Sequence, residues 1–135
     1  MYKALNYWVF GGFGGERTAE EFIDFAAAQG LDGVELTVGD VIAPDADETR
    51  CRALRDYAAA KGVGLRSVAT GAYWNCSLGA ADPAERRAAV DFTRRYLQIA
   101  AWLGAGAALV VPGAACVPWD SSRPAVPYGE AWENS

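Results

Sequence analysis

The sequence predicts an α/β fold in which strands and helices alternate along one parallel sheet. Short apolar segments bounded by glycine alternate with longer segments whose apolar residues recur every three or four positions. Each joint from a helix to the next strand carries two glycines, and the first glycines of the three joints, Gly30, Gly62 and Gly104, are 32 and 42 residues apart. A repeat of this size is typical of βα units, whose parallel strands are covered by helices. We expect a single domain over residues 1–135.

The first unit begins with a predicted strand over residues 3–10, which is rich in aromatic and aliphatic residues and runs into the glycine-rich loop 11–15. A helix is expected from Thr18, because Thr18 and Glu21 have the spacing of a capping box. In that motif the hydroxyl and the carboxylate each accept a hydrogen bond from a free backbone amide. Gly30 is expected to end this helix.

The second and third units follow the same plan. Strands are predicted over residues 33–38 and 65–70, with a helix over residues 47–61 between them. A third and longer helix is expected after Asp82, an N-cap residue that is followed by proline at the first helical position, and Gly104 is expected to end it.

The fourth unit is incomplete. A strand is predicted over residues 107–111, a loop with three prolines follows, and residues 128–135 have the composition of a helix that has just begun. We therefore expect the chain to be the first part of a larger fold, truncated near the start of the fourth helix.

The composition excludes several classes of function. The chain has no histidine, which rules out Ser-His-Asp and Cys-His nucleophile systems and every metal site with a histidine ligand. Its 12 basic and 17 acidic residues give a net charge of −5, which argues against a nucleic acid partner. No charge occurs from Tyr96 to Trp119, but glycines and prolines cut this run into pieces too short to span a membrane. The three cysteines form no CxxC pair and no secretion signal is present, so we predict a cytoplasmic protein.

Glu35 is the best candidate for a catalytic residue. It stands in a strand otherwise made of apolar residues, so its carboxylate needs a partner or a cavity to avoid a desolvation penalty. Two interpretations remain open. Glu35 faces a substrate pocket near the carboxyl end of its strand, or it forms a salt bridge with Arg66 on the neighbouring strand.

The loop Gly11–Gly15 supports an alternative function. A glycine-rich loop between a strand and a helix, with an acid such as Glu35 on the next strand, is part of the fingerprint of dinucleotide-binding folds. The fingerprint is incomplete, because Arg17 occupies the position of its last glycine and the helix cap at Thr18 lies too far along the chain. A fragment of an NAD-type nucleotide-binding oxidoreductase is thus one alternative.

Aromatic residues gather after three of the predicted strands. Tyr7 and Trp8 lie near the end of the first, Tyr73 and Trp74 follow the third, and Trp119 follows the fourth. Flat apolar rings with polar edges suit sugar rings, although they are equally common in cores and lids. Their position at the carboxyl ends of strands, where α/β barrels build their sites, makes sugar binding as good an interpretation as core packing.

Several segments carry a resemblance to a known family. They are Gly33–Leu36, Asn75–Leu78, Asp82–Arg86, Ala100–Ala105 and Val110–Gly113. In this combination the chain resembles the sugar phosphate isomerase/epimerase family, the xylose-isomerase-like TIM barrels that include ketose 3-epimerases. The most specific part is Asp-Pro-x-x-Arg before a long helix that ends in Leu-Gly-Ala.

The resemblance implies a (β/α)8 TIM barrel, of which this chain supplies the first four βα units, a half barrel with parallel strands. It also implies one divalent metal (Mn, Mg or Co) in the complete protein, bound by carboxylates and a histidine from the last four strands. These metal ligands are absent from this chain. We expect six substrate-binding residues: Asn6, Trp8, Glu35, Gly71, Trp74 and Trp119. Most of them are carried over from the family, and the rest come from the aromatic groups.

The resemblance implies that the chain is the N-terminal half of a metal-dependent sugar or sugar phosphate isomerase/epimerase of carbohydrate metabolism. We expect this chain alone to be inactive. A full barrel needs about 250 residues, and four units leave a sheet with two open edges. The expected partners are a small sugar or sugar phosphate and either the remaining half of the barrel or a second chain. A non-catalytic carbohydrate-binding or assembly subunit completed by another chain is the second alternative.

Overall fold

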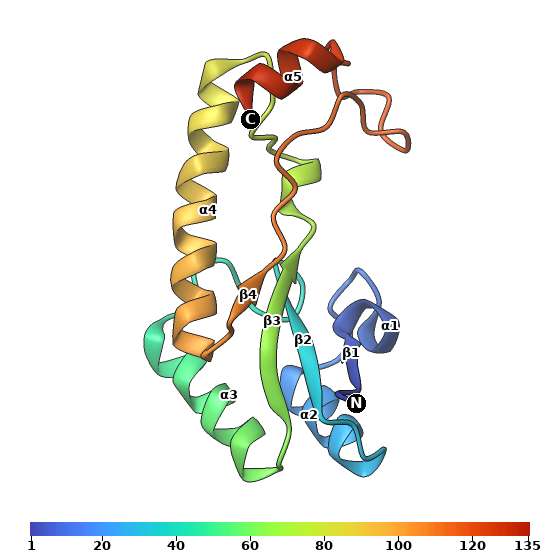
Figure 1. Ribbon diagram of the computed structural model, residues 1–135, viewed down its shortest axis with the longest axis vertical. Helices are drawn as coiled ribbons and strands as arrows, with labels where there is room; N and C mark the ends of the chain where they lie inside the picture. The colour runs from blue at the N-terminus through green and yellow to red at the C-terminus, as the bar shows by residue number, and fades with distance from the viewer. The chain divides into compact units, whose positions relative to one another are not determined.

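The computed structural model describes residues 1–135 and contains four strands joined by helices (Figure 1). In chain order the elements are β1 (Ala4–Asn6), α1 (Tyr7–Gly11), α2 (Ala19–Ala28), β2 (Gly33–Val38), α3 (Glu48–Ala60), β3 (Gly64–Thr70), the 3₁₀ helix η1 (Ala72–Trp74), α4 (Pro83–Leu103), β4 (Ala107–Ala108) and α5 (Tyr128–Asn134). The strands form one sheet in the order β1-β2-β3-β4, and every neighbouring pair is parallel. The predicted α/β class with a parallel sheet is therefore confirmed.

The chain divides into two compact units. Unit 1 comprises Met1–Thr70 and Arg95–Leu109, and unit 2 comprises Gly71–Arg94 and Val110–Ser135. Unit 1 contains all four strands together with α1, α2 and α3.

The strand register gives the sheet of unit 1 two different faces. Val34 pairs with Leu65 and Leu36 pairs with Val68, and all four side chains are buried. Val34 and Leu36 share one face because side chains alternate along a strand, and the register shift after Val34 brings Leu65 and Val68 of β3 beside them. The helices α2 and α3 pack against β2 and β3. Glu35 alternates with Val34 and Leu36 and belongs to the opposite face.

Glycine ends each helix of the repeat as predicted. Gly30, Gly62 and Gly104 have φ angles of 63°, 73° and 74°, in the left-handed region that favours glycine. Each of these glycines reverses the chain direction between a helix and the strand that follows it.

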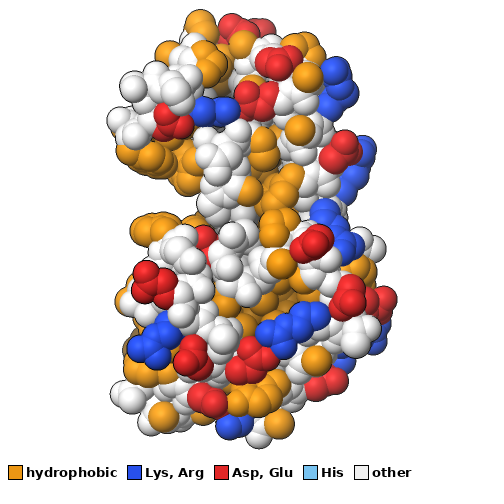
Figure 2. Space-filling view, turned by 180° about the vertical axis from the view of Figure 1, so that it is seen from behind, with side chains coloured by type: hydrophobic (Ala, Val, Ile, Leu, Met, Phe, Trp, Pro, Cys, Tyr) orange, Lys and Arg blue, Asp and Glu red, His pale blue; other side chains and the backbone are white.

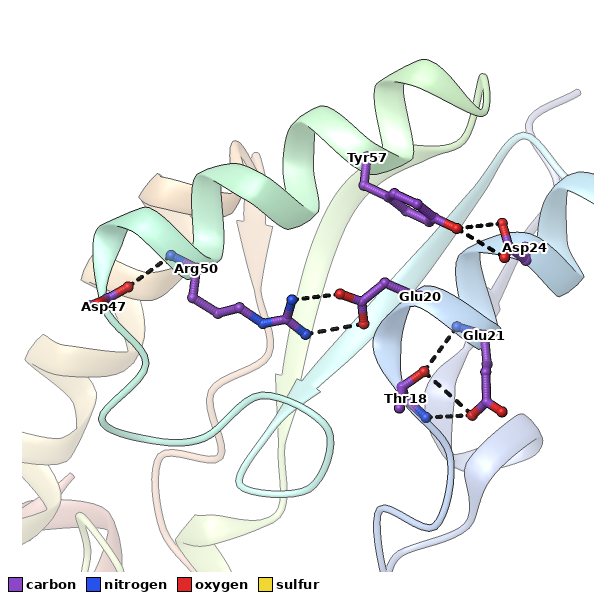
Figure 3. Close-up of polar contacts among 7 residues, drawn as sticks. All are labelled: Thr18, Glu20, Glu21, Asp24, Asp47, Arg50 and Tyr57. Carbon is purple, nitrogen blue, oxygen red and sulfur yellow. Dashed lines mark hydrogen bonds and ion pairs between the residues drawn. The ribbon is translucent and has the colours of Figure 1, made fainter.

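Polar side chains define the starts of α2 and α3 (Figure 3). The capping box is present as predicted, because the amide of Glu21 donates to Thr18 Oγ1 at 3.1 Å and the amide of Thr18 donates to Glu21 Oε2 at 2.8 Å. At the start of α3, the amide of Arg50 donates to Asp47 Oδ1 at 2.7 Å. On the face of the molecule shown in Figure 2, acidic and basic side chains are interspersed.

The ion pair between Glu20 of α2 and Arg50 of α3 predicts a pH-dependent coupling between the two helices. Arg50 Nη2 donates to Glu20 Oε2 at 3.0 Å, and this contact holds the pKa of Glu20 below its ordinary value of 4.5. Because the folded-state pKa is lowered, the stabilisation is present at neutral pH and is lost as the pH falls through that pKa. A double-mutant cycle of E20Q and R50Q, measured by urea unfolding, is expected to give a coupling of about 0.5–1 kcal/mol at neutral pH and none in acid. A coupling of equal size in acid would contradict this assignment.

Two buried threonines predict opposite effects of the same substitution. Thr37 is fully buried in β2 and its hydroxyl has no hydrogen-bond partner, whereas Thr70 in β3 donates to the carbonyl of Val38 at 2.8 Å. Valine has nearly the same shape without the hydroxyl. We expect T37V to raise the free energy of unfolding by about 1 kcal/mol and T70V to lower it by about 1 kcal/mol. Urea unfolding of both variants measures this difference, and a destabilising T37V would be incompatible with an unpaired hydroxyl.

The first strand is shorter than predicted, and this part of the prediction is wrong. β1 ends at Asn6, and Tyr7–Gly11 forms the helix α1 in place of the second half of the expected strand. The reason is that Asn6 Oδ1 accepts the amide of Trp8 at 2.8 Å and so caps a helix. Gly11 allows this helix to pack tightly, because a Cβ at that position would lie 2.2 Å from the Tyr7 ring.

The fourth strand is also shorter than predicted. β4 contains Ala107 and Ala108, and the amide of Leu109 still donates to the carbonyl of Val68 at 2.9 Å, after which pairing with β3 stops. Pro112, which has no amide hydrogen, lies in the segment that continues from there. The helix expected over residues 128–135 is present as α5. No helix in the chain is both long enough and apolar enough to cross a membrane.

Candidate functional site

Asn6 and Glu35 form a direct pair across β1 and β2. They are partners in the strand register, and Asn6 Nδ2 donates to Glu35 Oε1 at 2.6 Å. The other side-chain atom of Asn6, Oδ1, is held by the amide of Trp8, so the amide group is fixed in one orientation. Glu35 is half-buried, and its second oxygen, Oε2, has no hydrogen-bond partner within the chain. The pair therefore presents one fixed carboxylate with a free acceptor.

Glu35 is the third residue of β2 (Gly33–Val38), so it lies within the strand and not near its carboxyl end. It is level with the last residue of β1, and the register continues from Glu35 to Ser67 on β3 and from Ser67 to Ala107 on β4. One layer across the sheet is thus made of polar or small residues. This layer belongs to the face opposite α2 and α3.

The strand register excludes the interpretation in which Glu35 forms a salt bridge with Arg66. Between Val34 and Glu35 the pairing with β3 shifts by one residue, from Leu65 to Ser67, so Arg66 has no partner on β2. The Arg66 guanidinium lies over the ring of Tyr2, 5.3 Å from its centroid, and makes no ion pair with Glu35. The partner of Glu35 within the chain is Asn6.

Trp8 is fixed beside this pair by contacts that the sequence did not indicate. Its indole Nε1 donates to Asp40 Oδ2 at 2.8 Å, and its ring lies 5.3 Å from the ring of Phe13. The glycine-rich loop closes onto the same segment, because a Cβ at Gly15 would lie 2.7 Å from the carbonyl oxygen of Asp40. Trp8 was expected on the first strand, but it lies on α1.

The glycine-rich loop does not have the geometry of a dinucleotide-binding site. It follows the helix α1 and not a strand, and Gly12 is the C-cap of that helix. At the start of α2, the side chain of Thr18 accepts the amide of Glu21 within the capping box. A phosphate-binding loop requires a strand that leads directly into free helix amides.

In unit 2, Trp74 and Trp119 lie edge to face. Their ring centroids are 5.1 Å apart with an interplanar angle of 75°. Trp74 belongs to η1, and its amide donates to the carbonyl of Gly71 at 3.1 Å. Trp119 is 68% exposed, so one of its faces is available to a ligand. Of the predicted substrate-binding residues, the structure brings these two together in unit 2 and brings Asn6, Trp8 and Glu35 together in unit 1.

The residues of this chain do not fit a metal site. No group of three or more Asp, Glu or Cys side chains is arranged to hold a metal ion, and there is no histidine. The metal implied by the family resemblance has no ligand set among residues 1–135.

Cys51 and Cys76 are unsuited to nucleophilic catalysis. Burial raises the pKa of the thiols of Cys51 and Cys76 above the ordinary value of a cysteine. A nucleophilic cysteine needs the opposite shift, since the thiolate is the reactive form.

Comparison with known proteins agrees with this fold. The chain matches, over 99% of its length, a D-psicose 3-epimerase solved in the presence of D-fructose (TM-score 0.78, 19% identity). It matches D-psicose 3-epimerase from Clostridium cellulolyticum H10, solved with D-tagatose, to the same extent (TM-score 0.74, 18% identity). The chain spans 44% of the length of each of these proteins, which is consistent with half of a TIM barrel. No curated protein shows significant similarity to the sequence.

The family model provides the assignment. The model described as xylose isomerase-like TIM barrel matches residues 23–135, which is most of the chain and includes β2, β3 and β4. The chain belongs to the xylose isomerase-like TIM barrel family.

Proposed function

We propose that this chain is the N-terminal, substrate-binding half of a metal-dependent isomerase or epimerase that acts on a sugar or sugar phosphate. The family supports this proposal, and so do two structural neighbours whose crystals contained the ketohexoses D-fructose and D-tagatose. The chain spans 44% of those neighbours, and we assign the groups that bind the metal to the remaining half of the barrel or to a second chain.

The observation that carries the proposal is the pairing of Asn6 with Glu35. A sugar offers several hydroxyl donors, and Glu35 Oε2 is a charged acceptor without a partner, at the level where β1 ends. The Asn6 amide holds the carboxylate in place, so little side-chain freedom has to be lost when a hydroxyl binds. Glu35 thereby orients the sugar, and it is also the first candidate for a catalytic residue in this chain.

Aromatic residues in each unit are suited to the apolar parts of a sugar ligand. A sugar ring has C–H faces edged by hydroxyl groups, which suits indole rings. Trp8, fixed through Asp40, is assigned to this role in unit 1, and Trp74 and Trp119 are assigned to it in unit 2, next to Gly71. Their second role is to exclude water from the ketose while a proton is removed beside the carbonyl and returned to the opposite face or the neighbouring carbon.

Solvent deuterium exchange tests the proposal in the complete protein. Incubation with D-fructose, D-tagatose and phosphorylated ketoses in D2O with Mn²⁺, Mg²⁺ or Co²⁺ is expected to yield an epimer or aldose that carries deuterium at the carbon next to the carbonyl. Absence of any isomer and of exchange would contradict the enzyme assignment. In that case, thermal stabilisation by a sugar alone would favour a carbohydrate-binding subunit, and stabilisation by NAD⁺ would favour the oxidoreductase alternative.

A further inference from the structure

Glu85 joins three segments of unit 2. It lies in the first turn of α4, and its Oε1 accepts the amide of Ser77 at 2.8 Å. The same oxygen accepts Arg123 Nη2, which comes from the long loop before α5. The side chains of Glu85 and Arg123 are 20% and 23% exposed, well below the other ion pairs of the chain. A partly buried pair is screened less by water and salt than a surface pair, so this contact is suited to hold the loop.

The loop that contains Arg123 also contains Trp119 and is held by internal hydrogen bonds. The amide of Asp120 donates to the carbonyl of Val117 at 3.0 Å, and the amide of Arg123 donates to the carbonyl of Asp120 at 3.2 Å. The hydroxyl of Ser122 donates to Asp120 Oδ1 at 2.6 Å. These bonds form two successive turns, 117–120 and 120–123, so a contact that holds Arg123 also limits the position of Trp119.

Trp119 has little else to fix it. Its ring is 68% exposed and meets the ring of Trp74 edge to face. Such a ring pair contributes a small stabilisation, which is insufficient to order a long loop without a further contact.

We propose that Glu85 and Arg123 form a positioning pair that holds Trp119 against Trp74. With the pair intact, the two indoles form an aromatic corner whose open face receives the apolar side of a ligand ring. That this ligand is a sugar rests on the proposed function, whereas the effect of the pair on the loop does not. Neither residue touches the ligand in this assignment, and both act through Trp119.

Circular dichroism of the complete protein tests the pair independently of activity, because two indoles in contact give a coupled tryptophan band. The difference spectra of W74F and W119F identify this band. We expect E85Q and R123Q each to lose most of it, and the double variant E85Q/R123Q to lose no more than either. R123K keeps the charge and is expected to retain the band, and R87Q, at an exposed arginine of α4, serves as the matched control. A band that persists in folded E85Q and R123Q would overturn the proposal.

Thermal melts show whether the glutamine variants fold. If they do not, R123K decides, since loss of the band in that folded variant contradicts a role for the ion pair.

Kinetics with the ketose separate this proposal from the proposed function. We expect KM to rise about three- to tenfold in E85Q and R123Q with kcat nearly unchanged, as for the loss of one aromatic contact. Loss of the band without any change in KM would support the positioning pair and remove Trp119 from the sugar site.

Discussion

Replacement of Glu35 by glutamine is expected to raise the KM of the complete protein for its ketose roughly 10- to 100-fold, with a much smaller change in kcat. Glutamine keeps the size of the side chain and an oxygen for the Asn6 amide, but it removes the charge from the acceptor assigned to a sugar hydroxyl. A hydrogen bond to a charged group contributes about 1.5–3 kcal/mol, and about 1.4 kcal/mol corresponds to a tenfold change in affinity. Steady-state kinetics measure both constants.

Glu48 provides the matched control for Glu35. It is exposed on α3 and forms an ion pair with Arg52 of the same helix, so E48Q is expected to leave both constants unchanged. A loss of kcat at constant KM in E35Q would assign Glu35 to the reacting atoms and not to substrate binding. Unchanged KM and kcat in a folded E35Q protein would exclude Glu35 from the site.

Replacement of Gly33 by alanine is expected to lower the free energy of unfolding by about 2–3 kcal/mol. Gly33 starts β2 and is paired with Gly64 at the start of β3. A Cβ on Gly33 would lie 2.0 Å from the hydroxyl oxygen of Tyr2 and 2.5 Å from the carbonyl oxygen of Gly64. The tyrosine can move away, but the carbonyl is part of the sheet and can move only if the pairing of the two strands is disturbed.

Gly106 is the control for this substitution. Gly106 lies directly before β4, and the nearest atom to a Cβ there would be the carbonyl oxygen of Arg66 at 3.9 Å, an ordinary contact. Urea unfolding is expected to show G106A close to the parent and G33A well below it. A full rescue of G33A by Y2A would show that the clash is with the tyrosine alone and would contradict the role of the Gly64 carbonyl.

The middle of the fold could be predicted because several local signals agree there. The capping box of Thr18 and Glu21 and the glycines that end the helices act within a few residues, and each is present in the structure. The first strand could not be predicted correctly, because the four apolar residues Tyr7–Phe10 have no period that separates a strand from a short helix. The side chain of Asn6 caps a helix here, so the residues after it form α1 and not a continued strand.

The candidate site shows the same limit. Glu35 could be identified because a charged residue in an apolar strand needs an explanation, but its partner could not. Asn6 lies 29 residues away and was paired with it by the sheet, while a register shift of one residue excluded Arg66. The contacts of Trp8 with Asp40 and of Arg123 with Glu85 also join residues more than 30 positions apart. Such contacts are set by the tertiary fold, for which a single sequence contains no local signal.

A crystal structure of the complete protein with a bound ketose is the most direct test of the division of roles proposed for this chain. We predict that sugar hydroxyls lie within hydrogen-bonding distance of the Glu35 carboxylate, and that any bound metal takes its ligands from outside residues 1–135. A sugar bound away from Asn6 and Glu35, or a metal coordinated by side chains of these 135 residues, would contradict it.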